Sequence, residues 1–438
     1  MNKTIITTVG TSLISNWKET NKFGLTEEIR QQLKELEGSS FFEVSATTMD
    51  NYINYIKGEY IEKGILQLLK EFLNAKSDCA EISSITAIEN ELRKSLKEGE
   101  ELNLTIHLLC TDTILSPLCA EVIAGYLRTK GYNVAFHEQE NIVSEIKNSN
   151  FKSEFIIRDL RVDNKEKFEK KGLITLIEKF YSIVEQNCEF DTVTNEYRPS
   201  CILNITGGYK GLIPYLTIFS QISKVKICYL FEDTNDIIQI PQASISLDWN
   251  FIAQNSSIFN DLANVQVLER TEDWQTYKQQ HNVPDTFDNY YSLLSEQDGT
   301  KLLGLNAIGT ILHKELGNYF FVEIPINSRY FKDEFSIKKE VNKAIKDLYY
   351  KLSNLSEPFN TLTDPLLKHC NIDDTTVYKD TSSHLRIQYV YSQSKKALCV
   401  INYYYKRETD EYQKIMKQEY ASTYKEAELT ILPFKKTL

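Results

Sequence analysis

Apolar positions follow two different spacings along the first 240 residues. Short runs of aliphatic and β-branched residues predict strands, and between them apolar residues recur at helical spacing. The predicted strands are 3–9, 104–110, 132–137, 154–158, 201–206, 225–231 and 236–240. The predicted helices are 24–37, 53–75, 82–98, 116–129, 164–187 and 208–222. Strands that alternate with helices in this way predict an α/β fold with a mainly parallel, doubly wound sheet.

Beyond residue 240 the pattern changes twice. Residues from about 245 to 316 lose the strand alternation and predict helices, which we interpret as a small, winged-helix-like connector (257–268, 286–296 and 303–315). From about residue 319 the pattern predicts a compact α+β unit with strands at 319–326, 384–391 and 397–404 and helices at 336–355 and 409–426. We therefore divide the chain into three domains, 1–245, 246–318 and 319–438.

Two predicted strands of the α/β domain end in similar glycine turns. Residues 3–12 read KTIITTVGTS, and residues 201–214 read CILNITGGYKGLIP with a helical pattern directly after the glycines. Such a turn directs backbone N–H groups and a helix N-terminus toward an anion. Neither turn matches a P-loop or the G-x-G-x-x-G fingerprint of dinucleotide-binding proteins.

A third predicted strand also ends in polar residues, Thr111-Asp112-Thr113. In a doubly wound sheet, ligands bind outside the carboxyl ends of the strands at the point where the strand order reverses. We therefore expect these residues to lie at one sheet edge together with Gly10-Thr11-Ser12 and Thr206-Gly207-Gly208. Three polar strand ends in one domain predict a site for a polar, phosphate-bearing ligand.

Composition narrows the class of protein. The net charge of −11 argues against general nucleic-acid binding, but residues 379–438 carry a net +4 and are rich in tyrosine. The eight cysteines are scattered without a C-x-x-C pair, and the six histidines lack metal-ligand spacing, so we expect free thiols in a reducing cytoplasm and no metal site. We find no signal peptide and no apolar run of about 18 residues, the length that spans a bilayer.

The basic C-terminal segment has the residue types that bind and cut RNA without a metal. Cations hold phosphates, and aromatic rings stack unpaired bases. In cleavage by the ribose 2′-OH, Arg and Lys can stabilise charge on the phosphorus centre, while Tyr or Lys can transfer protons. The candidate side chains are Lys379, Arg386, Lys406, Arg407, Tyr389, Tyr404, Tyr405 and Tyr412, with His384 as a further candidate.

The two glycine turns, TTVGTS and NITGGYKG, resemble those of the CRISPR-associated Rossmann fold (CARF) found in ancillary proteins of type III CRISPR systems. The resemblance covers about residues 1–245 and implies a homodimer that binds a cyclic oligoadenylate across its two-fold axis. We expect the activator to be cyclic tetra-adenylate. It implies ligand-binding roles for Gly10, Thr11, Ser12, Asn204, Thr206, Gly207, Gly208 and Lys210. Thr111 and Asp112 join this set from the sheet geometry alone.

Residues 319–438 resemble a RelE-type toxin, a ribosome-dependent mRNA interferase. The resemblance rests on Tyr378-Lys379, Arg386-Ile-Gln-Tyr389, Lys406-Arg407 and Tyr412, in that order. It implies that Lys379, Arg386 and Arg407 act on the phosphate, that Tyr412 stacks on a base and that Lys406 assists. The family often has a second basic residue where this chain has Thr381, so the general base stays unassigned.

Together the resemblances imply a CARF–RelE fusion: a cytoplasmic, metal-independent endoribonuclease that a cyclic oligoadenylate activates to cut mRNA on ribosomes during antiviral defence. Its expected partners are a second copy of the chain, the ribosome and mRNA, with no membrane, no specific DNA and no cofactor. One alternative is a CARF-type transcriptional regulator, although the connector contains no basic recognition helix. A metal-dependent nuclease, or a ligand-binding protein with an inert C-terminal cap, is also open.

Overall fold

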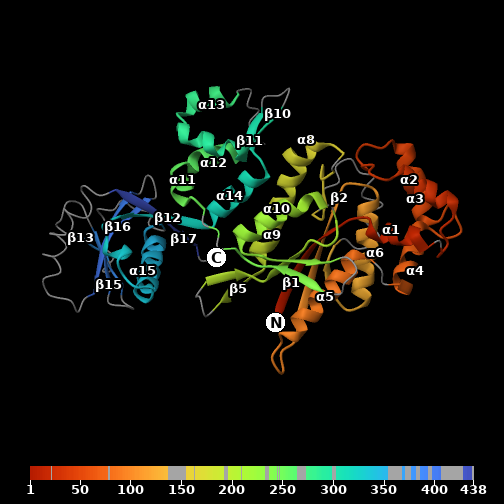
Figure 1. The fold of residues 1–438 in the computed structure, drawn as a ribbon, viewed down its shortest axis with the longest axis horizontal. Helices are drawn as coiled ribbons and strands as arrows, with labels where there is room; N and C mark the ends of the chain where they lie inside the picture. Colours follow the sequence, from red (N-terminus) through yellow and green to blue (C-terminus); the bar gives the residue numbers. More distant parts are fainter. Residues whose placement is uncertain are drawn as a thin grey trace. The chain divides into compact units, whose positions relative to one another are not determined.

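The computed structural model describes residues 1–438 except 21, 77–78, 137–153, 162, 192–195, 209, 232–235, 244, 246, 264–272, 298–301, 354–366, 370–375, 381–384, 393–396, 406–427 and 437–438. The chain forms two compact units (Figure 1). The first unit contains Met1–Ile245 and Leu262–Leu312, and the second contains Ser246–Asp261 and His313–Leu438.

A mainly parallel sheet forms the centre of the first unit, as the sequence predicts. Its main path runs β3-β2-β1-β7-β8-β9, and β4 pairs with β2 beyond the end of β3. Neighbouring strands are parallel except for β9, which runs antiparallel to β8. The strands are β1 (Asn2–Val9), β2 (Asn103–Thr111), β3 (Asn133–Ala135), β4 (Ile156–Ile157), β7 (Cys201–Asn204), β8 (Lys226–Leu230) and β9 (Ile237–Ile240).

Helices cover both faces of this sheet, which explains why β7 and most of β1 are buried on both faces. Successive strand residues point to opposite faces, so Ile5 of β1 enters one hydrophobic core and Ile6 enters the other. The Ile5 side holds α1 (Ser12–Thr20), α2 (Glu27–Glu35), α3 (Ala46–Lys57), α4 (Ile65–Lys76), α5 (Ala80–Lys94) and α6 (Leu115–Thr129). The Ile6 side holds the π-helix η1 (Phe168–Gly172), α9 (Leu173–Gln186) and α10 (Ile213–Ser223), with the short α8 (Lys165–Lys167) preceding η1 (Figure 1).

Local structure differs from the prediction at three places in this unit. The helix predicted over 53–75 is two helices, because Gly58 adopts a left-handed φ of +85° and ends α3. Helix α1 starts at Ser12, directly after the glycine turn, where no helix is predicted. The antiparallel strands β5 (Cys188–Asp191) and β6 (Glu196–Pro199) are also not predicted.

The segment 246–318, which we predict as a connector, is shared between the two units. In the first unit, Ile311 is fully buried and its carbonyl accepts a 3.1 Å hydrogen bond from the Tyr181 hydroxyl. In the second, Trp249 packs against Tyr319 with ring centroids 4.6 Å apart. The segment comprises α11 (Trp249–Gln254), α12 (Ser256–Ala263), α13 (Trp274–His281), the 3₁₀ segment η4 (Asp285–Leu293), β10 (Leu294–Gln297), β11 (Leu302–Leu305) and α14 (Ala307–Gly317). The pairing of β10 with β11 replaces the start of the helix predicted over 303–315.

The second unit contains a six-stranded sheet in the order β13-β14-β15-β16-β12-β17. As predicted, helix α15 (Phe335–Ser353) is amphipathic, and its Val341, Ile345, Leu348 and Leu352 lie buried against the sheet. The other elements are β12 (Tyr319–Pro325), the 3₁₀ turn η5 (Arg329–Phe331), β13 (Leu367–His369), β14 (Thr376–Lys379), β15 (Leu385–Ser392), β16 (Ala397–Tyr405) and β17 (Leu429–Lys435). Strands β13, β14 and β17 are not predicted, and the helix predicted over 409–426 lies outside the described residues. Within the described part of the chain, no helix is both long and apolar enough to cross a membrane.

We expect Leu348→Ala to destabilise the second unit by about 2–5 kcal/mol, because Leu348 is fully buried between α15 and the sheet and truncation leaves a cavity. Lys343→Ala on the exposed side of the same helix should change the free energy of unfolding by less than about 0.5 kcal/mol. Urea unfolding followed by circular dichroism measures both. Equal effects of the two substitutions would contradict the packing assigned to α15.

Candidate functional site

The strand order of the first unit reverses between β1 and β7. The chain leaves β1 for α1 on one face of the sheet and leaves β7 for the 3₁₀ turn η2 (Lys210–Leu212) and α10 on the other. The two strands are parallel and pair directly, with Thr4 opposite Cys201 and Thr7 opposite Asn204. Their carboxyl ends therefore lie side by side at a topological switch point, the usual ligand site of such sheets.

The two glycine turns meet at this switch point. A Cβ atom added to Gly10 would lie 3.2 Å from the Cα of Gly208, so the backbones of the two turns are in close contact. The Thr8 hydroxyl donates a 2.8 Å hydrogen bond to the Gly207 carbonyl and ties the end of β1 to the second turn. Gly208 has a φ of +86°, and a Cβ there would lie 2.5 Å from Thr8 Oγ1. The structure thus requires glycine where the turns touch.

Asn204 and Thr206 hold the second glycine turn in place through hydrogen bonds. The Asn204 side chain is fully buried and donates hydrogen bonds to Thr7 Oγ1 (3.1 Å) and Ser84 Oγ (2.7 Å). Its Oδ1 accepts the Thr206 N–H at 3.2 Å, and Thr206 Oγ1 in turn accepts the Leu230 N–H at 2.8 Å. Both residues, predicted as ligand contacts, link β7 to its neighbours and shape the turn.

Thr11 and Lys210 are the predicted site residues that the two turns expose to solvent. The Thr11 carbonyl accepts the Ser15 N–H at 3.0 Å and so belongs to the first turn of α1. Lys210 begins η2 directly after the second turn, while Ser12 is half-buried. A cation beside two backbone turns is suited to an anionic ligand. Tyr209 lies outside the described residues.

The third polar strand end, Thr111-Asp112, is closed by another segment of the chain. Both residues are buried, and the Thr111 N–H donates to Ser116 Oγ at 3.2 Å. Asp112 Oδ2 accepts hydrogen bonds from Ser40 Oγ (3.3 Å) and the Asp159 N–H (3.2 Å), and its carbonyl accepts the Phe41 N–H (3.3 Å). This burial raises the pKa of Asp112. The residues lie on β2, adjacent to β1 as predicted, but their side chains point into this packing.

A residue that we did not predict, Glu81, lies at the switch point. It is fully buried in the first turn of α5, where Oε1 accepts the Gly10 N–H at 3.0 Å and Oε2 accepts the Ser12 hydroxyl at 2.6 Å. In the sequence, an acidic residue at a helix start indicates only a favourable interaction with the helix dipole. Its contacts with Gly10 and Ser12 span about 70 residues of chain, so no local pattern shows them.

In the second unit, Lys379, Arg386 and Tyr404 form one cross-strand row. Lys379 pairs with Arg386 across β14 and β15, and Arg386 pairs with Tyr404 across β15 and β16. Paired residues share a face, and the neighbours Leu385 and Ile387 point into the core beneath α15. The row therefore lies on the face opposite α15. Lys406, Arg407 and Tyr412, with His384 and Thr381, lie outside the described residues.

Two of the tyrosines considered as RNA contacts lie on the α15 side of this sheet. Tyr389 is fully buried in the core with α15. The Tyr405 hydroxyl donates a 3.0 Å hydrogen bond to Glu340 of α15, and burial together with this carboxylate raises the pKa of Tyr405 to about 12. Both rings stabilise the packing of α15, and neither shares the face of Arg386.

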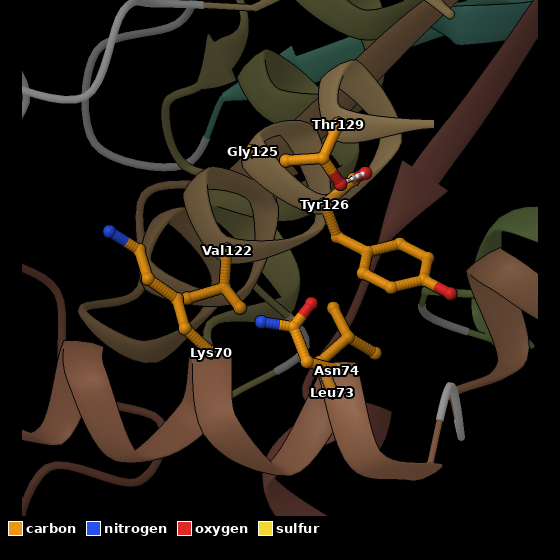
Figure 2. A pocket seen from close by; sticks show the side chains of 7 residues that line it. All are labelled: Lys70, Leu73, Asn74, Val122, Gly125, Tyr126 and Thr129. Atoms are coloured by element: carbon orange, nitrogen blue, oxygen red, sulfur yellow. Dashed lines mark hydrogen bonds between the residues drawn. The ribbon is translucent and has the colours of Figure 1, made fainter. Parts of the chain in front are cut away.

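A small cavity of about 100 Å³ lies between α4 and α6 (Figure 2). Figure 2 shows Lys70 and Asn74 of α4 beside Val122, Tyr126 and Thr129 of α6. Helix α6 starts near the carboxyl end of β2 and runs back along the sheet, so its last turn lies away from the switch point. The cavity is well below the roughly 300 Å³ typical of sites for larger ligands. We therefore assign the candidate site to the switch point.

Residues 76–243 match the model of a family described as CRISPR-associated protein (Cas_APE2256). The matched segment includes α5 with Glu81, the end of β2 and the second glycine turn. The comparison with curated proteins gives no match. The fold is thus α/β with a candidate ligand site at the switch point, and the family match supports a CRISPR-associated protein.

We expect Gly208→Ala to destabilise the first unit by at least about 1 kcal/mol more than Gly131→Ala. Both glycines have a left-handed φ (+86° and +88°), but an added Cβ clashes with Thr8 at Gly208 and meets open space at Gly131. Gly131→Ala should cost only the left-handed strain, about 1–2 kcal/mol. Thermal unfolding of the two variants checks this difference. Equal melting temperatures would show that the turns do not touch.

The free energy of unfolding should depend on the protonation of Glu121. This residue of α6 is 1% exposed, and burial raises its pKa from 4.5 to about 7. Because the folded chain binds this proton more tightly than the unfolded chain, the contribution of Glu121 to stability falls as pH rises from about 4.5 to about 7.

Glu121→Gln removes this titration, so the variant should exceed the wild type by about 1–3 kcal/mol more at pH 8 than at pH 4. Urea unfolding across this pH range provides the measurement. A stability difference that stays constant with pH would contradict the raised pKa.

Proposed function

We propose that this chain is an endoribonuclease of the type III CRISPR response that a cyclic oligoadenylate activates, with cyclic tetra-adenylate as the activator. The observation that carries the proposal is the position of the second glycine turn. This turn belongs to the segment matched to a CRISPR-associated family, and it meets the Gly10 turn at a topological switch point. The segment matched to the family therefore includes a turn that lies at the switch point of the sheet.

The switch point has chemistry suited to such a ligand. A cyclic oligoadenylate presents phosphates and ribose hydroxyls around a ring, and Thr11 and Lys210 are the exposed polar side chains that the two turns carry. The Lys210 ammonium would interact with a phosphate, and the Thr11 hydroxyl with a phosphate or ribose oxygen. In a homodimer, the switch points of the two copies would face one ring across the two-fold axis.

The row of Lys379, Arg386 and Tyr404 supports RNA cleavage in the second unit. In the proposed reaction, the ribose 2′-hydroxyl gives its proton to a base that is not assigned, and its oxygen attacks the adjacent phosphorus. The 2′,3′-cyclic phosphate forms as the bond to the 5′-oxygen breaks, and that oxygen takes up a proton. Lys379 and Arg386 would stabilise the charge on the phosphorus centre. Arg407 would act on the same phosphate, Lys406 would assist, and Tyr412 would stack on a base.

Activation requires two arrangements of the protein with different affinities for the ligand. A ligand shifts such an equilibrium only by the difference in its binding free energy to the two states. We propose that the dimer with bound cyclic oligoadenylate favours the arrangement in which the row of Lys379, Arg386 and Tyr404 contacts mRNA in the ribosomal A site.

The proposal predicts that purified protein with cyclic tetra-adenylate cuts mRNA at codon-spaced positions on ribosomes, and that EDTA added to the enzyme has no effect under conditions in which the ribosomes stay intact. Primer extension on a translated mRNA measures the cuts. Equal cleavage without the cyclic ligand would contradict activation. Ligand-dependent binding to promoter DNA without RNA cleavage would favour a transcriptional regulator.

Arg386→Ala tests the assignment of the cutting site. We expect cleavage to fall by about 100-fold or more, as for loss of one charge-stabilising group, with unchanged affinity for cyclic tetra-adenylate. Lys343→Ala, which removes a cation from the exposed side of α15, should retain full cleavage. Full activity of Arg386→Ala would place the cutting site elsewhere.

A further inference from the structure

The first turn of α5 supports both glycine turns of the switch point. Among the described residues, the N-cap residue Cys79 gives no side-chain hydrogen bond to this helix. Ser12, which follows Gly10 in the first glycine turn, supplies this hydrogen bond instead: its hydroxyl oxygen accepts the Ala80 N–H at 3.3 Å. Ser84, one helical turn further, accepts the hydrogen bond from Asn204 at the end of β7. Helix α5 is thus the common base of the two turns.

Glu81 fills the space between these turns. Both carboxyl oxygens accept hydrogen bonds from the first glycine turn: Oε1 lies 3.0 Å from the Gly10 nitrogen, and Oε2 lies 2.6 Å from Ser12 Oγ. On the other side, a Cβ added to Gly207 would lie 2.5 Å from Glu81 Oε1. The side chain therefore has no room to withdraw toward the second turn.

The donors that Glu81 occupies are those that would otherwise attract a phosphate. A strand-end N–H group beside a helix N-terminus forms an anion cradle, and here the anion belongs to the protein. A ligand phosphate placed against Gly10 would meet a like charge within a few ångströms and would lack a free donor. The exposed side chains of the two turns are Thr11 and Lys210, so a ligand approaching from solvent meets these first.

We propose that Glu81 is a specificity-determining residue of the switch point: it keeps phosphate groups out of the Gly10 cradle and confines them to the Lys210 side. A simple anion such as phosphate then has little affinity for the site, whereas a ligand that also presents sugar and base groups binds through several contacts. The inference rests on the proposed function only for the identity of that larger ligand.

Three variants separate the charge of Glu81 from its shape. Glu81→Gln keeps the shape and removes the charge, while Glu81→Ala also empties the cradle. Glu91→Gln is the matched control, because Glu91 lies on the same helix with its side chain 56% exposed. The probe is inorganic phosphate, measured by isothermal titration at constant ionic strength, and thermal unfolding reports whether each variant is folded.

We expect Glu81→Ala to bind phosphate at least about tenfold more tightly than the wild type, with Glu81→Gln between them and Glu91→Gln unchanged. Equal phosphate affinity of folded Glu81→Ala and wild type would overturn the proposal. If Glu81→Ala does not fold, Glu81→Gln decides, and an affinity no tighter than that of the wild type overturns it.

Cyclic tetra-adenylate provides the second measurement. In Glu81→Ala, the preference for this ligand over inorganic phosphate should fall by at least about tenfold, with Glu81→Gln between Glu81→Ala and the wild type and Glu91→Gln unchanged. If the wild type does not bind cyclic tetra-adenylate, the proposed function is wrong, while the phosphate measurements still decide the role of Glu81.

Discussion

The parallel pairing of β1 with both β2 and β7 is the constraint on which the first unit depends. With a strand on each side and helices over both faces, β1 is enclosed along its length, and its residues from Thr4 to Val9 are all buried. The accessible polar groups of β1 therefore lie at its two ends, and the carboxyl end is the one that meets the second glycine turn. The reversal of strand order at this point sends the chain to opposite faces after β1 and after β7, which separates the helices and leaves the two turns in contact.

A different periodicity organises the second unit. The apolar stripe of α15 selects one face of the sheet, and the two-residue period of β15 then separates Leu385 and Ile387 from Arg386. The cation is directed away from the helix by the same alternation that builds the core. Tyr389 is three positions after Arg386 and is buried on the helix side. The Arg-x-x-Tyr spacing suggests that the two side chains act together, but they lie on opposite faces of the sheet.

The sequence predicted what local patterns encode: the parallel sheet, the apolar face of α15 and the meeting of two strand-end turns. It did not predict contacts between distant segments. Asp112 looks like an open strand end until Ser40 and Phe41 close it, and Glu81 looks like an ordinary helix start until Gly10 and Ser12 reach it. Strand β11 falls within a predicted helix because its sequence, LLGL, fits a helix as well as a strand, and its pairing with β10 decides between the two.

The hydrogen bond between Ser12 and Ala80 also has a consequence for the chain between them. Helices α1 to α4 leave the sheet at Ser12 and return at Ala80, and the two ends are joined by a 3.3 Å contact. The segment from Ser12 to Ala80 is therefore a closed loop, and its two ends stay joined whatever path the chain takes between them. The entropy of closing a loop grows only with the logarithm of its length. The turns between these helices can therefore be lengthened or shortened while the sheet edge that carries the two glycine turns keeps its geometry.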